Sequence, residues 1–378
     1  MQWMGGAARA AGAIVLVIAG PRTVQGQADP SPPPLPLSIS AVCEVPDSIG
    51  TRLESISRRV NGETGFAAIH VESGTRIVFN GSQRFPMASV SKVPMALEYL
   101  RRVDEGALDP AERVRVPITD FRPGNSPMAS WSGGRAVHIT VDSLFGLMIG
   151  ASDNTATDVI LNMAGGPAAA TRRVRELGVV DIDVHRSEAR TFADLSGLSD
   201  SIPESELYRY QYFRLRDALP QAHRDSAREA YQTDPRDTST PAGMAELLLR
   251  IHTGEGLTAD SRRRLLDSMT ETRTGARRMK ALLPDGTRVA HKTGTMAGAV
   301  NDVGIVSLPS GDHLIVAAFV NTLRSSTRRR ERTIAEMTRV AYDVFNEAPL
   351  RTAAVNSPAG SESRAAANGS IGSCPVGP

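Results

Sequence analysis

Apolar and polar residues alternate in two stretches of the chain, and this alternation predicts two β-hairpins. Residues 65–80 contain two short strands, FAAIHV and RIVF, joined by a turn at Gly74. Residues 303–308 and 313–321 predict a second hairpin, with Pro-Ser-Gly in its turn. Apolar positions at helical spacing follow at 333–345. We therefore expect strands near both ends of the folded region.

The chain between these hairpins is predicted to be mainly helical, because apolar residues recur there every three or four positions. The predicted helices are 93–103, 141–149, 155–164, 168–177 and 241–252. An antiparallel sheet built from both chain ends, flanked by helices and carrying an inserted helical subdomain, is the α/β (α+β) architecture that these patterns favour. We place this domain at 47–350, with its α/β part at 47–84 and 240–350 and its helical part at 85–239.

The two ends of the chain have a different character. Residues 1–28 carry one early charge (Arg9), an apolar run at 11–19 and then small residues, which predicts a cleaved secretory signal and hence a secreted or periplasmic protein; a flexible apolar leader is the alternative. No stretch reaches the roughly 18–20 apolar residues that a membrane helix needs. Residues 29–46 form a Pro-rich linker, and 351–378 form an Ala/Ser/Gly-rich tail too poor in large apolar residues to pack.

Composition excludes several classes of partner and cofactor. The 43 basic and 41 acidic residues nearly cancel, so we expect no nucleic-acid partner, and we expect a monomer. Neither a CxxC nor an HExxH motif occurs and the seven histidines are scattered, so we expect no metal or other cofactor. The two cysteines, Cys43 and Cys374, are compatible with a terminal disulfide and equally with two separate thiols.

Lysine is rare in this chain, and two of its three lysines lie in short polar motifs. The three are Lys92, Lys280 and Lys292, whereas the other basic residues are arginines. Arginine cannot be deprotonated in proteins, but a buried lysine can act as a base. Positions that keep lysine therefore draw attention to chemistry that an arginine could not perform.

Three motifs carry the candidate chemistry. In the first, Ser89 and Lys92 lie three positions apart before a predicted helix, so that Lys92 can activate the Ser89 hydroxyl; alone, this pattern is common on ordinary helices. The second, Ser-Asp-Asn at 152–154, opens a helix and also suits simple helix capping. In the third, Lys-Thr-Gly-Thr at 292–295, Gly294 permits close approach of the backbone to a ligand.

In this order, the three motifs resemble the signature of the serine β-lactamase and penicillin-binding-protein superfamily. The segments 149–167, 237–242 and 283–306 are similar to class A β-lactamases, and the resemblance covers about 47–347. It implies a β-lactamase/transpeptidase-like fold, and a small-molecule substrate that is a β-lactam or an acyl-D-alanine-like compound. It also implies an enzyme that opens the β-lactam amide through a covalent acyl intermediate.

The resemblance assigns roles in catalysis position by position. It makes Ser89 the nucleophile and Lys92 its base or proton relay. Ser152 passes the proton to the leaving nitrogen, while Lys292 holds the Ser152 hydroxyl and attracts the substrate carboxylate. The backbone N–H groups of Ser89 and Thr295 form the oxyanion hole, where each donor contributes about 3–4 kcal/mol.

Substrate binding is assigned in the same way. Asn154 binds the side-chain amide of the substrate, and the hydroxyls of Thr293 and Thr295 contact its carboxylate, with Gly294 between them.

The base that hydrolyses the acyl-enzyme is the least regular part of the resemblance. The family's Arg-x-Glu pattern falls on Glu188, but the position of its water-holding Asn is Phe192 and that of its Pro is Ala189. Glu188 is therefore the candidate base, and a surface carboxylate paired with Arg186 or Arg190 is the alternative.

The segment 193–235 is longer than the family pattern, so we interpret it as an insertion beside this loop. Glu204 or Glu206 within it could in principle replace Glu188. Its aromatic cluster predicts a small satellite core rather than a binding platform. The cluster comprises Tyr208, Tyr210, Tyr212 and Phe213. Trp131 is a candidate for the aromatic residue that the family carries at the rim of its cleft, an exposed loop tryptophan being the other interpretation.

Three functions remain compatible with the sequence. The leading hypothesis is a class A-type serine β-lactamase. The altered surroundings of Glu188 motivate a D-alanyl-D-alanine peptidase or esterase related to the penicillin-binding proteins. A β-lactam sensor that is acylated once and stays acylated requires Glu188 to be out of reach.

Overall fold

A five-stranded antiparallel sheet joins the two ends of the folded chain. The structure is a computed structural model that describes residues 47–347. The strand order is β2-β1-β9-β8-β7, so the N-terminal hairpin pairs directly with the C-terminal one. The strands are β1 (Glu63–His70), β2 (Arg76–Phe79), β7 (Val289–Met296), β8 (Ala299–Ser307) and β9 (His313–Asn321). Both predicted hairpins are confirmed.

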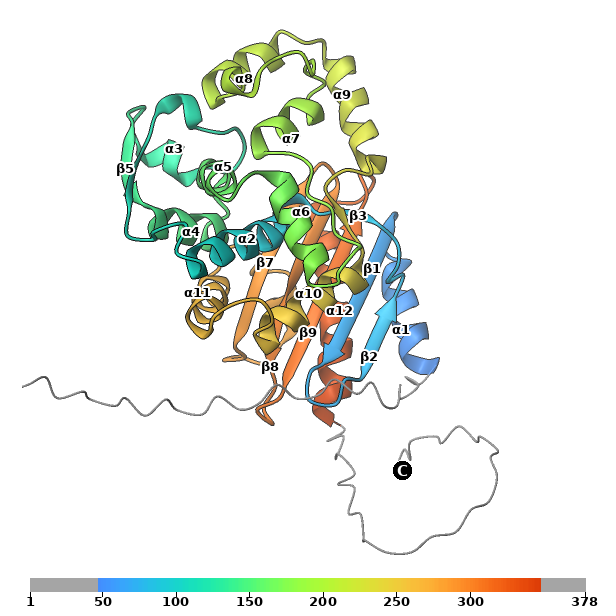
Figure 1. Cartoon of the computed structure of the whole chain (residues 1–378). Coiled ribbons are helices and arrows are strands. Elements are labelled where there is room, and N and C mark those ends of the chain that lie inside the picture. Colours follow the sequence, from blue (N-terminus) through green and yellow to red (C-terminus); the bar gives the residue numbers. More distant parts are fainter. Residues whose placement is uncertain (1–46, 348–378) are drawn as a thin grey trace, which may run out of the picture. The chain divides into compact units, whose positions relative to one another are not determined.

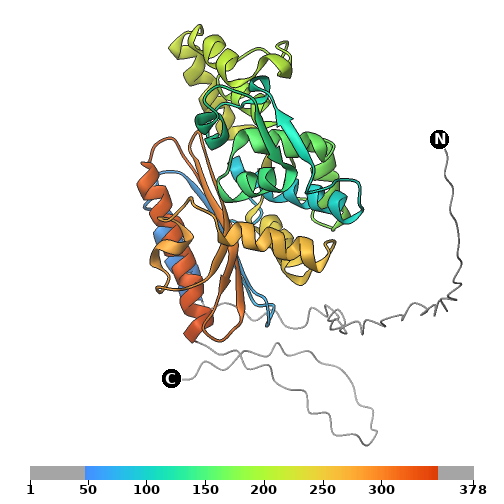
Figure 2. The ribbon, with the colours of Figure 1, turned by 90° about the vertical axis from the view of Figure 1, so that its left-hand side faces the viewer.

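Helices cover both faces of this sheet, as Figure 2 shows in side view. Helices α1 (Asp47–Ser57) and α12 (Thr327–Glu347) pack on one face, and α10 (Pro241–Thr253) and α11 (Ala259–Thr270) on the other. Side chains alternate along a strand, so Phe66 of β1 enters one core and Ala67 the other. Because helices cover both faces, the central strands are almost continuously buried.

The inserted helical region is centred on α2 (Lys92–Asp104), which is buried along most of its length. Around it lie α4 (Val141–Gly150), α5 (Asn154–Met163) and α6 (Pro167–Glu176), all close to their predicted positions. The predicted antiparallel sheet with flanking helices and an inserted helical region is confirmed. The shorter elements are β3 (Phe85–Pro86), η1 (Ala88–Ser91), β4 (Arg113–Val116), η2 (Ile118–Asp120), α3 (Pro127–Trp131), β5 (Val137–Thr140), β6 (Thr238–Ser239) and η5 (Met279–Leu282).

The predicted insertion folds as a helical lobe next to α5 (Figure 1). The helix α7 (Glu188–Leu195) begins before the predicted insertion and leads into it, and η3 (Glu204–Glu206), α8 (Arg209–Asp217), α9 (Gln221–Ala230) and η4 (Tyr231–Thr233) lie within it. They enclose a small core of their own, as the aromatic residues predicted. Tyr212 is buried in this core and Phe213 packs against it, whereas Tyr210 is exposed.

Some predictions concern residues outside the described part of the chain. These are the signal peptide (1–28), the linker (29–46), the tail (351–378) and the pairing of Cys43 with Cys374. Among residues 47–347, no helix has both the length and the apolar character needed to cross a membrane.

Candidate active site

Ser89 lies in a tight 3-10 turn, η1, that leads directly into α2. Its main-chain oxygen accepts a hydrogen bond from the N–H of Lys92, the first residue of α2. The preceding residue, Ala88, has a φ of +47°, a left-handed conformation that costs a non-glycine residue about 1–3 kcal/mol. The Ser89 side chain is half-buried, and its hydroxyl makes no hydrogen bond to any residue in 47–347. The turn therefore presents this hydroxyl for reaction.

Strand β7 approaches this turn so closely that position 294 requires glycine. A Cβ on Gly294 would lie 2.6 Å from the carbonyl oxygen of Met87 and 3.2 Å from the backbone nitrogen of Ser89. On the neighbouring strand, Asn301 donates from Nδ2 to the carbonyl oxygens of Pro86 and Met87, each at 2.9 Å. The sheet thus fixes the backbone that leads into Ser89.

Lys92 is fully buried, and its ammonium contacts residues from two other parts of the chain. Nζ donates to Asn154 Oδ1 (2.8 Å), to the carbonyl oxygen of Ser152 (3.0 Å) and to Ser152 Oγ (3.3 Å). It also forms an ion pair with Glu188 Oε1 at 3.2 Å. The first two predicted motifs and the candidate base therefore meet at one nitrogen atom.

In the Ser-Asp-Asn motif, the outer two residues contact the lysines and the middle one caps a helix. Ser152 has a φ of +56° and places its hydroxyl 2.9 Å from Lys292 Nζ and 3.3 Å from Lys92 Nζ. The intervening Asp153 caps α5 by accepting the N–H of Ala156 at 2.9 Å. The capping interpretation is thus correct for Asp153, whereas the residues on either side of it face the lysines.

Lys292 lies on β7, is fully buried and donates to Ser152 Oγ and to the carbonyl oxygen of Thr293. Burial and, next, the like charge of Lys92 lower the pKa of Lys292 well below its ordinary value, while the carboxylates of Glu188 and Asp302 oppose this shift. The side chain is held in place by these two acceptors, Ser152 Oγ and Thr293 O.

Glu188 is the first residue of α7 and is buried, so the alternative of a surface carboxylate is wrong. Burial and the nearby charge of Asp158 raise the pKa of the Glu188 carboxyl, while Lys92 opposes the rise. Arg186 pairs with other carboxylates, and Arg190 donates to the carbonyl oxygen of Ile202. A raised pKa is what a general base working near neutral pH requires.

Asp158 of α5 positions Glu188, and sequence reasoning missed it. Its carboxylate accepts the backbone N–H of Glu188 (2.7 Å) and of Ala189 (3.1 Å), at the start of α7. Arg122 donates to the same carboxylate at 2.7 Å. The contact spans 30 residues and has no sequence motif, so only the fold reveals it.

Two aromatic residues reach this site, Phe192 on α7 and Tyr231 in the insertion. Phe192, at the position where the family has Asn, packs so tightly that a Cβ on Gly124 would lie 2.2 Å from its ring. Tyr231 of η4 is buried and, with Glu188 and Thr191, lines a cavity of about 10 Å³, which is room for about one water molecule. Tyr231 was not predicted, because the polar segment around it gave no sign of approaching the motifs.

The other residues that the sequence offered as candidates make no hydrogen bond or ion pair with Ser89, the two buried lysines or Glu188. Glu204 and Glu206 are exposed on η3, on the surface of the insertion. Trp131, at the end of α3, is 57% exposed, which agrees with an exposed tryptophan.

A third residue that the sequence did not reveal, Arg278, lies behind the Lys-Thr-Gly-Thr motif. It is buried and donates to Thr295 Oγ1 at 2.6 Å and to the carbonyl oxygen of Gly294 at 2.9 Å. Thr293 is buried, with its hydroxyl 2.5 Å from that of Thr274, whereas Thr295 is exposed. Arg278 adds positive charge beside the predicted carboxylate site, and as one arginine among many it carried no signal in the sequence.

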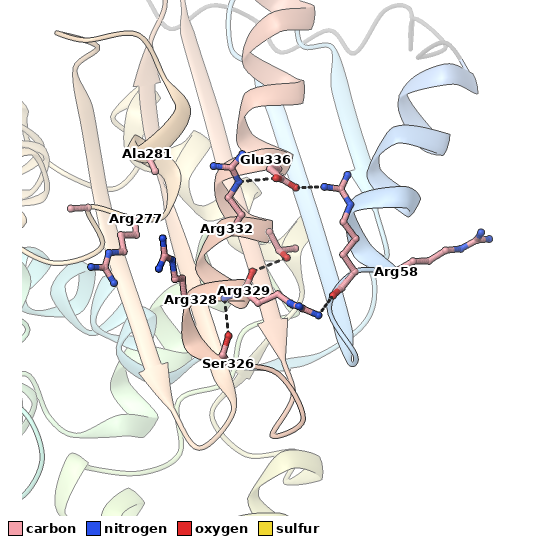
Figure 3. Close-up of a pocket in the computed structure, with 11 residues that line it drawn as sticks. Arg58, Arg277, Ala281, Ser326, Arg328, Arg329, Arg332 and Glu336 are labelled. Carbon is pink, nitrogen blue, oxygen red and sulfur yellow. Dashed lines mark hydrogen bonds and ion pairs between the residues drawn. The ribbon is translucent and has the colours of Figure 1, made fainter.

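Cavity size does not identify this site. A cavity of about 1010 Å³ lies elsewhere, among the two arginines that follow α1, the start of α12 and the segment 276–281 (Figure 3). Its lining is mainly arginine, and none of the three motifs contributes to it. Glu336 bridges Arg59 and Arg332 within it.

Comparison with known sequences gives a consistent result. A sequence model of the Beta-lactamase enzyme family matches residues 48–345. The extended-spectrum β-lactamase PER-1 of Pseudomonas aeruginosa is 30% identical over 298 residues, which cover 77% of this chain and 85% of that protein. β-Lactamase L2 of Stenotrophomonas maltophilia is 28% identical over 307 residues, which cover 80% of this chain and 88% of that one.

Solved structures agree. A β-lactamase from Chitinophaga pinensis has a TM-score of 0.66 and 29% identity, covering 79% of this chain and 100% of that chain. An ancestral class A β-lactamase has a TM-score of 0.64 and 30% identity, covering 79% of this chain and 100% of that chain. The family match includes all three motifs, and their side chains meet around two buried lysines. The chain belongs to the β-lactamase enzyme family.

Proposed function

We propose that the protein hydrolyses β-lactams through an acyl-enzyme on Ser89. One observation carries this proposal: the buried Lys92 ammonium lies within 3.3 Å of both the Ser152 hydroxyl and the Glu188 carboxylate, and Lys92 follows Ser89 by a single turn. A nucleophile, a proton relay and a second base are thereby placed within one hydrogen-bonded group. The names of the relatives support a β-lactam as the substrate.

In acylation, the Ser89 oxygen attacks the lactam carbonyl carbon while its proton passes to the base formed by Lys92 with Glu188. The lactam C–N bond then breaks, and Ser152 gives its proton to the leaving nitrogen while it takes up the Ser89 proton from Lys92, whose Nζ lies 3.3 Å from Ser152 Oγ. Lys292, 2.9 Å from Ser152 Oγ, orients that hydroxyl. The N–H groups of Ser89 and Thr295 stabilise the oxyanion, and the absence of a side chain at Gly294 leaves room for it.

In deacylation, Glu188 takes a proton from a water molecule that attacks the Ser89 ester. The C–O bond of the ester breaks, and the proton returns to the Ser89 oxygen. Support for this role comes from the burial of Glu188, its raised pKa and the cavity of about 10 Å³ beside it.

Two groups are suited to hold the substrate. Asn154 gives one Nδ2 hydrogen to the carbonyl oxygen of Pro123 at 2.9 Å, which leaves the other for a carbonyl of the substrate side chain. The substrate carboxylate is assigned to Thr293, Thr295 and Lys292, with Arg278 supplying further positive charge.

The test is turnover of a chromogenic cephalosporin by the purified chain, together with intact-mass spectra after mixing with benzylpenicillin. We expect rapid turnover, a transient adduct and loss of both in Ser89→Ala. Folded protein that neither reacts nor forms an adduct would contradict the proposal.

An adduct that lasts for hours would instead identify a sensor, the alternative that Phe192 at the Asn position favours. Hydrolysis of D-alanyl-D-alanine peptides faster than β-lactams would identify the peptidase.

We also propose that the protein is exported and acts as a monomer. Export is supported by the apolar run and small residues within 1–28, and N-terminal sequencing of the secreted protein tests it. Light scattering tests the monomer.

A further inference from the structure

We propose that two neighbouring turns, the one after β1 and the one before β9, form a binding site for a divalent transition-metal ion such as Zn²⁺. The ligands are His70 at the end of β1, Glu72 in the turn after it and Asp312 in the turn before β9. One ligand atom from each lies within 4.8 Å of the others. The site appears only in the fold, because 242 positions separate His70 from Asp312 in the sequence while their strands are neighbours in the sheet.

The distances suit a metal ion better than a direct hydrogen bond. His70 Nε2 lies 3.4 Å from Asp312 Oδ2 and 3.9 Å from Glu72 Oε2. An N–H donor normally lies about 2.7–3.2 Å from its oxygen acceptor, so neither contact is a good hydrogen bond. Two ligands of a tetrahedral zinc ion, each about 2.0–2.1 Å from the metal, lie about 3.3–3.4 Å apart. The His70–Asp312 separation matches that spacing, and a small side-chain rotation brings Glu72 to it.

Each turn is held in place by contacts that leave His70 Nε2 and the Asp312 carboxylate without a hydrogen bond to any residue in 47–347. The His70 ring is buried and stacks on Phe345, with ring centres 5.1 Å apart. His313 fixes Glu72 by donating its backbone N–H to Oε2, and its ring Nδ1 lies 2.9 Å from Oε1. Such outer contacts orient the ligands in metal sites. The main-chain bond from Val71 N–H to His313 O, at 2.9 Å, joins the two turns directly.

Metal binding requires one change of tautomer. His70 Nδ1 accepts the backbone N–H of Ser73 at 3.2 Å and lies 2.9 Å from Ser73 Oγ. With Nε2 bound to a metal, Nδ1 carries the proton and donates it to Ser73 Oγ. The nitrogen ligand selects zinc-like ions over Ca²⁺ and Mg²⁺, which prefer oxygen ligands.

The role expected for the ion is to clip two turns together. Asp312 lies in the turn between β8 and β9. The Lys-Thr-Gly-Thr motif lies near the turn between β7 and β8, at the opposite end of β8, so the proposed metal site is separated from the active site by the length of this strand. Bound metal should therefore raise the thermal stability of the protein without changing the chemistry at Ser89.

The experiment titrates the full chain, freed of metal and without a polyhistidine tag, with Zn²⁺ by calorimetry, and measures metal content after gel filtration. The variants are Glu72→Gln and Asp312→Asn, whose side chains are partly exposed, so the fold should survive. The matched control is His138→Gln, an exposed histidine on β5.

We expect one Zn²⁺ per chain in the original protein and the control, with binding about 10- to 100-fold weaker in the two carboxylate variants. Zn²⁺ should raise the thermal midpoint of the original protein but not that of Asp312→Asn. If the protein binds no Zn²⁺ at a concentration of about 100 µM, the proposal is wrong. Equal binding by Asp312→Asn, or equal affinity for Ca²⁺, would also overturn it.

Discussion

Arg186 Nε donates to Asp237 Oδ2 at 2.5 Å, and this bond joins the two ends of the chain segment that carries Glu188 and the insertion. Asp237 also accepts the backbone N–H of His185 at 2.7 Å and of Arg186 at 3.1 Å, and its own φ is +52°. The other end of the guanidinium reaches Asp194 and Asp234, both inside the segment. One buried arginine therefore anchors the two ends of a loop of about 50 residues to each other.

Removal of this anchor should destabilise the protein strongly. Arg186→Ala leaves three carboxylates without their shared cation, and breaking a buried pair in this way costs about 3–5 kcal/mol. Urea unfolding of the variant measures that cost. Arg263→Ala is the matched control, since its pair with Asp260 is exposed and should contribute no more than about 1 kcal/mol. A loss below about 1 kcal/mol in Arg186→Ala would show that the anchor is dispensable.

Glu188→Gln should separate the two halves of the reaction. The amide keeps the size of the side chain but cannot accept the proton of the attacking water, so deacylation should slow by about 10²- to 10⁴-fold. Stopped-flow turnover and intact-mass spectra should then show the penicillin adduct accumulating. Glu204→Gln, an exposed residue of the insertion, should behave like the original protein. Unchanged turnover in Glu188→Gln would remove it from the mechanism.

The pH dependence of turnover should have limbs set by two buried groups. Glu188 works as a base only when ionised, and its pKa lies above the ordinary 4.5, so activity should fall on acidification at a pH above 4.5. Lys292 binds the substrate carboxylate only as an ammonium, and its pKa lies well below 10.5. Activity should therefore fall as the pH rises through that lowered pKa, mainly through a higher KM. Profiles of kcat and kcat/KM from pH 4 to pH 10 measure both limbs, and an acidic limb at or below 4.5 would contradict the role given to Glu188.

The catalytic motifs could be predicted from the sequence because each depends on local spacing. Ser89 and Lys92 are one helical turn apart, and the Lys-Thr-Gly-Thr motif sits on one strand, so their residues stay together whatever the rest of the fold does. The hairpins and most helices were likewise predictable, since apolar periodicity reports directly on which face is buried.

Other parts of the site depend on contacts between distant segments. Asp158 and Tyr231 reach Glu188 from elements far away in the sequence, and no local pattern marks them. Ala88 and Ser152 have left-handed φ angles that neither residue type suggests. The helices of the insertion were missed because their polar sequence covers only a small core around Tyr212.

The closeness of β7 to the Ser89 turn leads to a final prediction, for Gly294→Ala. The added methyl group would lie 2.6 Å from Met87 O and must push the turn away from the strand. Overpacking of this kind costs about 1–3 kcal/mol of stability, and a displacement of about 1 Å can slow a reaction about 100-fold. We therefore expect slower acylation of Ser89 in burst kinetics, with a folded protein.

Gly50→Ala provides the matched control for this change. Gly50 lies on α1 with nothing within 4 Å of the added methyl group, so alanine should leave acylation unchanged and stabilise the helix by about 0.5–1 kcal/mol. If Gly294→Ala acylates as fast as Gly50→Ala, the strand does not constrain the Ser89 turn. If Gly294→Ala is slower only in deacylation, the added methyl group acts on the attack of water rather than on the oxyanion hole.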